Sequence, residues 1–241
     1  MRWLLALLPA STTLPAAAQA LQAVVGASSD YVYRGLSQTG GDAAVHAGAG
    51  LRWRSGLSAG VWASTIDSSR ERDGGDADAY EIDLLLGASG AIGGSERWSW
   101  DAGVGRYLYV GDARELDYDY TELAAGIGYR ERLRLSLAWS PDRSGYRDGY
   151  AVRRADAYAA ELAAGWPLAL QLRLLGGVGY HDLQRASGVS YRYWSAGLGW
   201  QHARYAVELL RIGSDRDARE RFGDVQAGTR TALTVSVRFG G

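Results

Sequence analysis

The sequence has 241 residues, of which 47% are hydrophobic, and its 26 Lys and Arg nearly balance its 27 Asp and Glu to give a net charge of -1. This balance gives no support for nucleic acid as a partner, and the absence of cysteine excludes disulfide bonds and zinc–thiolate sites. No stretch is apolar over the roughly 20 residues that a membrane-spanning helix needs. Tyr (15) and Trp (9) are abundant, and both residue types favour the boundary between membrane and water.

The N-terminal segment has the three parts of a secretory signal peptide. Arg2 supplies a positive charge, residues 3–14 are largely apolar, and Ala18-Gln19-Ala20 provides a small-x-small cleavage site. A membrane anchor is the competing interpretation, but Pro9 and the shortness of the apolar run argue against it. We therefore expect residues 1–20 to be removed and the mature chain to begin near Leu21, outside the cytoplasm.

Apolar and polar residues alternate through the rest of the chain. Between Asp42 and Arg54, Ala, Val, Leu and Trp occupy every second position, while mostly Gly, His and Arg occupy the others. Successive side chains of a strand point to opposite faces, whereas a helix would put Arg230 and Leu233 on the same side. The pattern predicts an all-β fold for residues 21–241, a transmembrane up-and-down antiparallel β-barrel. The expected strands, about twelve, span residues 22–34, 42–54, 57–66, 79–90, 97–109, 118–130, 132–140, 155–166, 168–180, 190–201, 204–212 and 225–239.

Residues 155–175 are rich in Ala and Leu and could also form a helix. Pro167 would interrupt that helix, and Tyr158, Leu162 and Trp166 fall on one face of an alternating pattern. The alternation favours a strand.

The expected connections alternate between short and long. Those at Ser55-Gly56 and near Glu131, Pro167 and His202 are very short. Outer-membrane barrels combine short periplasmic turns with long outer loops, so the long segments are expected on the outer side. These are residues 35–41, 67–78, 110–117, 141–154, 182–189 and 213–224.

Aromatic residues lie near the ends of the expected strands, on the face assigned to lipid. This placement predicts two aromatic girdles. The periplasmic girdle contains Trp53, Trp98, Tyr129, Trp166, Trp200, Tyr205 and Phe239, and the outer girdle contains Tyr31, Tyr33, Tyr80, Trp139, Tyr158, Tyr180 and Trp194. Strict alternation also points Arg106 at lipid, which requires a bulge or a snorkelling position.

The opposite faces predict a polar interior. Twelve tilted strands would leave an opening of roughly 10 Å after inward side chains are placed, and charges inside must pair or meet water. We therefore expect a narrow pore for small polar solutes, with a non-conducting barrel, in which ion pairs fill the interior, as the alternative. The candidate pore-lining residues are Asp30, Arg34, His46, Arg52, Glu81, Asp83, Asp101, Tyr107, Glu122, Arg134, Glu161, Arg173, Glu208 and Arg230.

No catalytic, metal or cofactor site is predicted. The three His are expected too far apart to share a metal, and although Ser187 and Ser190 lie near His181 in the sequence, such proximity is weak evidence for a hydrolase. An envelope lipid-modifying activity centred on His181 is kept as an alternative, together with a structural or ligand-binding role.

Charged loop residues suggest two further partners. Asp73, Asp76 and Asp78 lack the regular ligand ladder of a calcium loop, so we interpret them as a solvated acidic loop. Arginines in the outer loops could contact lipopolysaccharide phosphates, although ordinary charge balance with nearby acids is favoured. They are Arg70, Arg72, Arg216, Arg219 and Arg221.

Several segments carry a family resemblance. The stretch Ser29-Asp30-Tyr31-Val32-Tyr33-Arg34-Gly35-Leu36-Ser37-Gln38 resembles the opening signature of the TorF-type porins, the Gcw_chp family. Residues 56–64, 80–87, 107–109 and 118–123 resemble later segments of the same family. The resemblance implies a protein of the Gram-negative outer membrane with a pore function and no cofactor, delivered by the barrel assembly machinery. Such barrels commonly end on an aromatic residue, whereas Phe239 is followed here by Gly240-Gly241.

Overall fold

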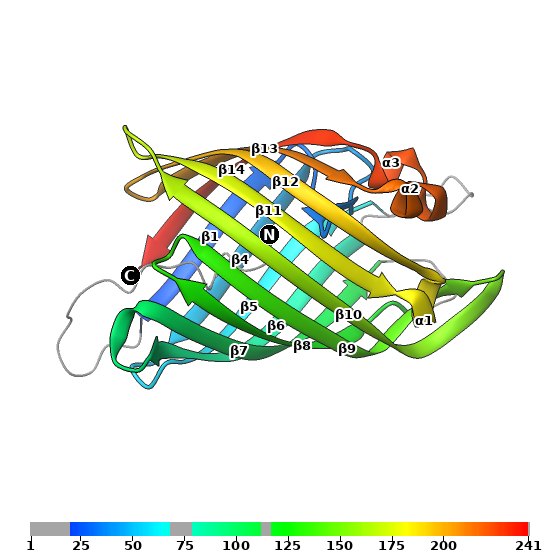
Figure 1. Ribbon diagram of the computed structural model, residues 1–241, viewed down its shortest axis with the longest axis horizontal. Coiled ribbons are helices and arrows are strands. Elements are labelled where there is room, and N and C mark those ends of the chain that lie inside the picture. The colour runs from blue at the N-terminus through cyan, green and yellow to red at the C-terminus, as the bar shows by residue number, and fades with distance from the viewer. Residues whose placement is uncertain (1–19, 68–78, 112–116, 241) are drawn as a thin grey trace.

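The computed structural model describes residues 20–67, 79–111 and 117–240. Over these residues, twelve strands form one closed antiparallel barrel, which confirms the predicted fold (Figure 1). The predicted signal peptide, apart from Ala20, lies outside the described residues. The barrel strands are β1 (Ala20–Ser28), β4 (Ala44–Arg52), β5 (Leu57–Ile66), β6 (Ala79–Ile92), β7 (Ser95–Val110), β8 (Tyr120–Tyr129), β9 (Leu133–Arg147), β10 (Tyr150–Pro167), β11 (Leu172–Leu183), β12 (Val189–His202), β13 (Tyr205–Ser214) and β14 (Arg230–Gly240).

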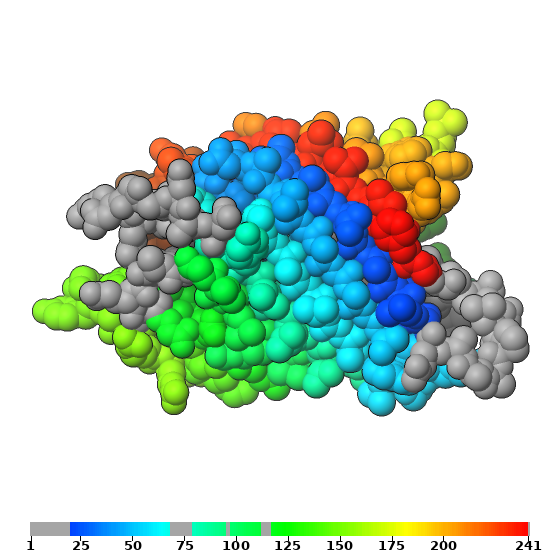
Figure 2. Space-filling view, turned by 180° about the vertical axis from the view of Figure 1, so that it is seen from behind, coloured from blue at the N-terminus to red at the C-terminus, as the bar shows by residue number. Residues whose placement is uncertain are grey.

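Each barrel strand pairs with its neighbours in the chain, and β1 pairs with β14 to close the ring. The closing register runs from Gln22 opposite Gly240 to Ser28 opposite Thr234. Figure 2 shows this closure, with β1 in blue beside β14 in red. Closure leaves no strand edge unpaired, which a spanning β-structure requires in lipid.

The two faces of the barrel differ as the alternation predicts. Leu135 and Val235 face outward and are 50% and 46% exposed, whereas Glu122 faces inward and is 2% exposed. A closed barrel with an apolar outer surface and charged residues inside is a fold of the Gram-negative outer membrane. Residues 155–166 lie in β10, so the strand interpretation of this segment is confirmed.

Outward aromatic residues gather at both ends of the strands. At the end with the short turns, called here the inner end, the rings of Trp98 and Tyr129 lie 4.7 Å apart, and the Arg132 guanidinium lies 4.4 Å from the Trp166 ring. At the opposite, outer end, Tyr80, Trp139, Tyr158, Tyr180 and Trp194 are exposed. The prediction was wrong for Tyr31 and Tyr33, which lie inside the barrel.

Arg106 points outward without a bulge in its ladder. Its guanidinium nitrogens lie 3.1 Å from Asp142, within β9, and 3.7 Å from Asp119, just before the outer end of β8. These two carboxylates compensate the outward charge, so ion pairing near the rim explains a residue that strict alternation left unexplained.

The outer end differs from the expected set of loops. Residues 141–154 form no loop there, because β9 and β10 continue to a tight turn at Asp148 (φ 52) and Gly149 (φ 82). Both φ values are positive, as a two-residue hairpin turn requires. The long β9–β10 hairpin projects beyond the rim at the right of Figure 1, beside α1 (Gln184–Ser187).

Two more helices occupy the expected loop 213–224 and the first residues of the last expected strand, 225–239. They are α2 (Arg216–Phe222) and α3 (Asp224–Ala227), and β14 starts only at Arg230. The Asp215 side chain caps α2 by accepting a hydrogen bond from the Ala218 amide, a strong helix-start signal. None of the described helices is long and apolar enough to cross a membrane.

Candidate functional site

The segment between β1 and β4 folds into the barrel. Residues 29–41 carry two short paired strands, β2 (Val32–Tyr33) and β3 (Leu36–Ser37), and we call this segment the lumen hairpin. The Asp30 carboxylate accepts hydrogen bonds from Ser37 Oγ (2.6 Å) and Thr39 Oγ1 (3.0 Å). The turn uses positive φ values at Arg34 (46°) and Gly35 (77°), so the first expected strand ends early and the chain reverses inside.

A buried ion pair attaches the tip of the hairpin to the wall. Arg34 donates to both carboxylate oxygens of Glu122 on β8, at 2.8 and 2.9 Å, and the two side chains are 8% and 2% exposed. Burial alone would lower the pKa of the Arg34 guanidinium, but the Glu122 carboxylate, together with Tyr33 and Tyr193, raises that pKa well above its usual range. This two-point contact fixes both the position and the orientation of the hairpin tip against the barrel wall.

Other contacts attach the hairpin to different walls. The Tyr31 hydroxyl donates to Glu81 on β6 (3.1 Å), and Arg230 on β14 donates to Asp30 (2.8 Å). Ser214 Oγ on β13 donates to the Gly35 carbonyl (2.8 Å). Because these strands lie on separate parts of the ring, the hairpin crosses the lumen.

An apolar cluster supports the hairpin near α2 and α3. Leu36 and Phe222 pack against its buried members, and the rings of Tyr191 and Phe222 meet edge to face with centroids 6.0 Å apart. The cluster therefore fills part of the outer mouth. Its buried residues are Ala157, Leu183, Val189, Tyr191, Tyr193, Ala218 and Ala227.

Asp30 and Arg34 were predicted on a barrel strand, and that placement is wrong. Both lie on the lumen hairpin, and Arg230 contacts Asp30 there. The estimate of a roughly 10 Å opening counted only inward side chains of strands. It therefore took no account of a chain segment that occupies the lumen.

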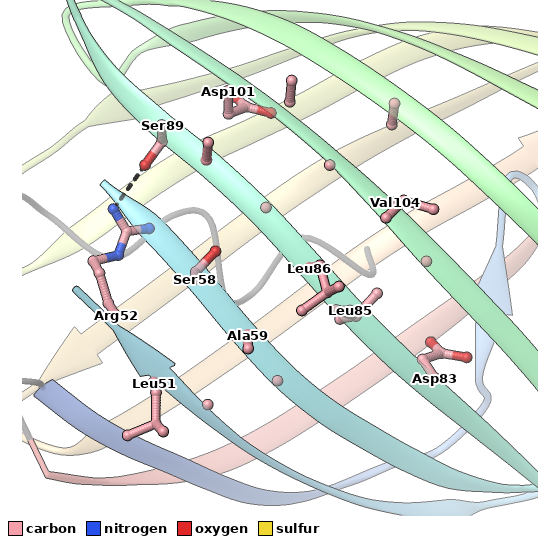
Figure 3. A pocket seen from close by; sticks show the side chains of 18 of the residues that line it. Leu51, Arg52, Ser58, Ala59, Asp83, Leu85, Leu86, Ser89, Asp101 and Val104 are labelled. Atoms are coloured by element: carbon pink, nitrogen blue, oxygen red, sulfur yellow. Dashed lines mark hydrogen bonds between the residues drawn. The ribbon is translucent and has the colours of Figure 1, made fainter. Parts of the chain in front are cut away.

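A cavity lies against the walls formed by β4 to β8 (Figure 3). Its empty volume is about 910 Å³, including space open to solvent. Arg52 on β4 donates to Ser89 Oγ on β6 (2.9 Å) within it. Glycine and polar side chains form most of the inward lining, and five of the predicted interior residues contribute to it. They are Arg52, Asp83, Asp101, Tyr107 and Glu122.

Asp101 on β7 forms an ion pair with Arg134 on β9, across the intervening strand β8. Gly126 of β8 lies beneath this pair, and a Cβ there would lie 2.6 Å from Arg134 Nη2 and 3.1 Å from Asp101 Oδ1. The missing side chain at Gly126 therefore makes room for the ion pair.

The remaining predicted interior residues are dispersed. His46 lies 6.0 Å from the Trp62 ring, between centroids, and Glu161 accepts a hydrogen bond from the Tyr193 hydroxyl (2.7 Å). Arg173 donates to the Glu131 carbonyl at an inner turn (3.0 Å). Glu208 lies on β13, apart from the cavity lining.

Five residues around the Arg34–Glu122 pair were not identified from the sequence. Ser140 Oγ also donates to Glu122 (3.2 Å), Tyr120 is fully buried, and Arg143 lies over its ring, 3.3 Å from the centroid. Gly35 packs against Tyr193 on the opposite side. The Arg-Gly pair at the hairpin tip was a usable turn signal, since glycine accommodates positive φ.

The structure gives little support for a hydrolase centred on His181 or for a metal site. His181 Nδ1 lies 3.0 Å from the Tyr191 hydroxyl, while Ser190 donates to Asp182 (2.9 Å). Within the described residues, no group of three or more His, Asp or Glu is arranged to hold a metal. The aspartates suggested for calcium, and Arg70 and Arg72, lie outside the described residues.

Two of the arginines considered for lipopolysaccharide are engaged within the chain. Arg216 pairs with Glu220 (2.5 Å), and Arg221 donates to the Ser187 and Tyr146 carbonyls. The Arg216–Glu220 pair favours the charge-balance interpretation, while the lipid partners stay a prediction.

Comparison with known proteins shows both a family and a fold. The family described as "Bacterial protein of unknown function (Gcw_chp)" matches residues 12–237. The "KdgM porin" is 8% identical, with a TM-score of 0.53 over 91% of this chain and 98% of that one. That porin is also solved "in complex with disordered oligogalacturonate" (8% identity, TM-score 0.54, the same coverage).

A second solved structure is also similar. The "COG4313 outer membrane channel from Pseudomonas putida F1" is 11% identical, with a TM-score of 0.58 over 95% and 97% of the two chains. At these identities the similarity concerns the fold alone. No curated protein matches the sequence.

Proposed function

The chain belongs to the Gcw_chp family of bacterial proteins, and we propose that it forms a narrow channel through which small polar solutes diffuse passively across the outer membrane. The TorF designation stays a prediction. The observation that carries the proposal is a solvent-open cavity inside a closed barrel, whose inward lining is mostly glycine and polar side chains. Its empty volume of about 910 Å³ includes open solvent.

Physical chemistry favours water in this cavity. Charged groups such as Asp83 and Arg52 line it, and burying them in a dry interior would cost several kcal/mol each. The KdgM porin, which has a similar fold and is also solved with oligogalacturonate, supports a route for polar solutes. The lumen hairpin narrows that route at the outer end, which restricts it to small molecules.

A plugged barrel is the second candidate, because one observation favours it. The Arg34–Glu122, Tyr31–Glu81 and Arg230–Asp30 contacts tie the hairpin to three strands. A hairpin held this firmly would block conduction, and the barrel would then serve a structural, ligand-binding or lipid-modifying role.

Recordings of the refolded chain in planar bilayers distinguish the two candidates. The comparison variant replaces residues 32–37 with Gly-Gly. That turn can join Tyr31 to Gln38, because the Gln38 amide already donates to the Tyr31 carbonyl (2.7 Å). A channel gives discrete conductance steps in the unaltered chain and larger steps in the shortened one.

The other outcomes are equally informative. A silent unaltered chain with a conducting shortened chain would establish the plugged barrel. Silence from both, when heat-modifiable migration on gels shows that both are folded, would overturn the channel.

A further inference from the structure

Arg143 is aimed into the lumen by an irregular stretch of β9. Ser140 faces inward and Asp142 faces outward toward Arg106, and Arg143 then turns inward over Tyr120. The pairing of β9 with β10 shifts register on both sides of Ala155, the partner of Arg143. Such bulges re-aim side chains and are frequent next to functional sites.

Arg143 is partly buried, and among the described residues its guanidinium lacks a hydrogen-bond acceptor at Nε. Its Nε is buried and has no hydrogen-bond partner among the described residues. The nearby Glu122 carboxylate is already occupied by Arg34 on both oxygens and by Ser140 on one. A buried donor without a partner is costly, and it points to a bound water, ion or ligand.

Two tyrosine rings lie between the cavity lining and this arginine. Tyr107 and Glu122 belong to the cavity lining, and the Tyr107 ring stacks on Tyr120 with centroids 4.4 Å apart and planes at 12°. Tyr120 in turn carries Arg143 over its ring. A solute at the outer end of the cavity therefore meets the Tyr107 ring, with the fully buried Tyr120 ring and the Arg143 guanidinium next to it.

We infer that Arg143 is the anion-recognition group of a solute-binding site in the outer lumen, and that the solutes it takes carry a carboxylate. A carboxylate accepts two parallel hydrogen bonds from a guanidinium, which would satisfy the Nε that the protein leaves without an acceptor. The Tyr107 ring at the cavity wall offers an apolar face to a flat or ring-shaped solute body. The inference rests on the proposed channel function, since it assigns that channel its solute class.

Glucose and glucuronate form a matched pair of probes that differ by the carboxylate. Saturation-transfer NMR titrations of the full chain in detergent measure both weak affinities without requiring conduction. We expect the chain to bind glucuronate at least about tenfold more tightly than glucose, the size of a charged hydrogen-bonding contact. Arg143→Gln should remove that preference. Arg211→Gln, the same change on the outer face where Arg211 contacts Thr231, should keep it.

Two results would overturn the inference: equal affinity of the unaltered chain for the two sugars, or an unchanged preference in Arg143→Gln. If Arg143→Gln does not fold, Arg143→Lys decides, because lysine keeps the charge but loses the two-point contact and should weaken the preference severalfold. An unchanged preference in Arg143→Lys would then count against Arg143. A silent barrel that prefers glucuronate would refute only the channel, and a conducting barrel without preference would refute only the site.

Discussion

Removing Arg34 should release the lumen hairpin. In Arg34→Met, Glu122 would keep Ser140 and the nearby Arg143 but lose both short hydrogen bonds to Arg34. Breaking a buried ion pair from one side costs about 3–5 kcal/mol, and these remaining neighbours favour the low end. A loss of about 3 kcal/mol corresponds to a roughly 150-fold rise in the population of the open hairpin.

Native-state hydrogen exchange measures that population directly. The reporting amides are those of Tyr31, Gln38 and Gly41, which donate to Thr39 Oγ1, the Tyr31 carbonyl and Ser37 Oγ within the hairpin. Their exchange should accelerate by about two orders of magnitude in Arg34→Met. Amides in the middle of the barrel strands should keep their rates.

A double-mutant cycle and a surface control complete this test. Adding Glu122→Gln to Arg34→Met should recover part of the protection, because a neutral amide is cheaper to leave buried than a carboxylate. Arg211→Met, on the outer face, should leave the hairpin amides unchanged. If the hairpin amides of Arg34→Met exchange within threefold of their rates in the unaltered chain, this ion pair does not hold the hairpin in place.

Three further predictions concern other parts of the barrel. Gly126→Val should separate Asp101 from Arg134 and lower the urea midpoint of refolded protein, whereas an unchanged midpoint would show that the pair tolerates a side chain there. Leu135→Arg places a charge on the lipid face and should cost about 2–4 kcal/mol if it lies near the bilayer midplane, measured by folding equilibria in lipid vesicles. Asp215→Ala removes the cap of α2 and should cost about 0.5–2 kcal/mol locally; it should speed exchange of the α2 amides only, and uniform acceleration across the barrel would contradict it.

The barrel was predictable because lipid imposes a simple rule on each strand. Leu135 and Val235 must face hydrocarbon while Arg134 and Ser236 face the interior, and a period of two records that requirement directly. Aromatic residues such as Trp98 and Trp166 mark strand ends for the same reason. Strand number and the facing of side chains therefore followed from local pattern alone.

The lumen hairpin was not predicted, because its position does not depend on the alternation of apolar and polar residues. The Tyr-Val-Tyr run at residues 31–33 alternates like a strand, yet Asp30 bonds to Ser37 and Thr39 and turns it inward. Those contacts depend on residues several positions away and on walls far apart in the chain. Alternation cannot show them.

The β9–β10 hairpin was missed for a different reason. Asp148-Gly149 is a strong local hairpin signal, but residues 141–154 were assigned as a loop because of their polarity. These residues are polar because this part of the two strands extends beyond the membrane and contacts water. The Asp-Gly dipeptide therefore already indicated, in the sequence, a turn with two positive φ values.

That projecting hairpin should be accessible on the cell surface, because the loop lengths predict that this end of the barrel faces outward. Its tip at Asp148 and Gly149 lies beyond the rim, where an antibody or an engineered tag would reach it without touching the lumen. Because the chain contains no cysteine, one thiol introduced at the tip would be its sole site for a membrane-impermeant dye. Labelling of intact cells would then read the orientation of the whole barrel from a single position.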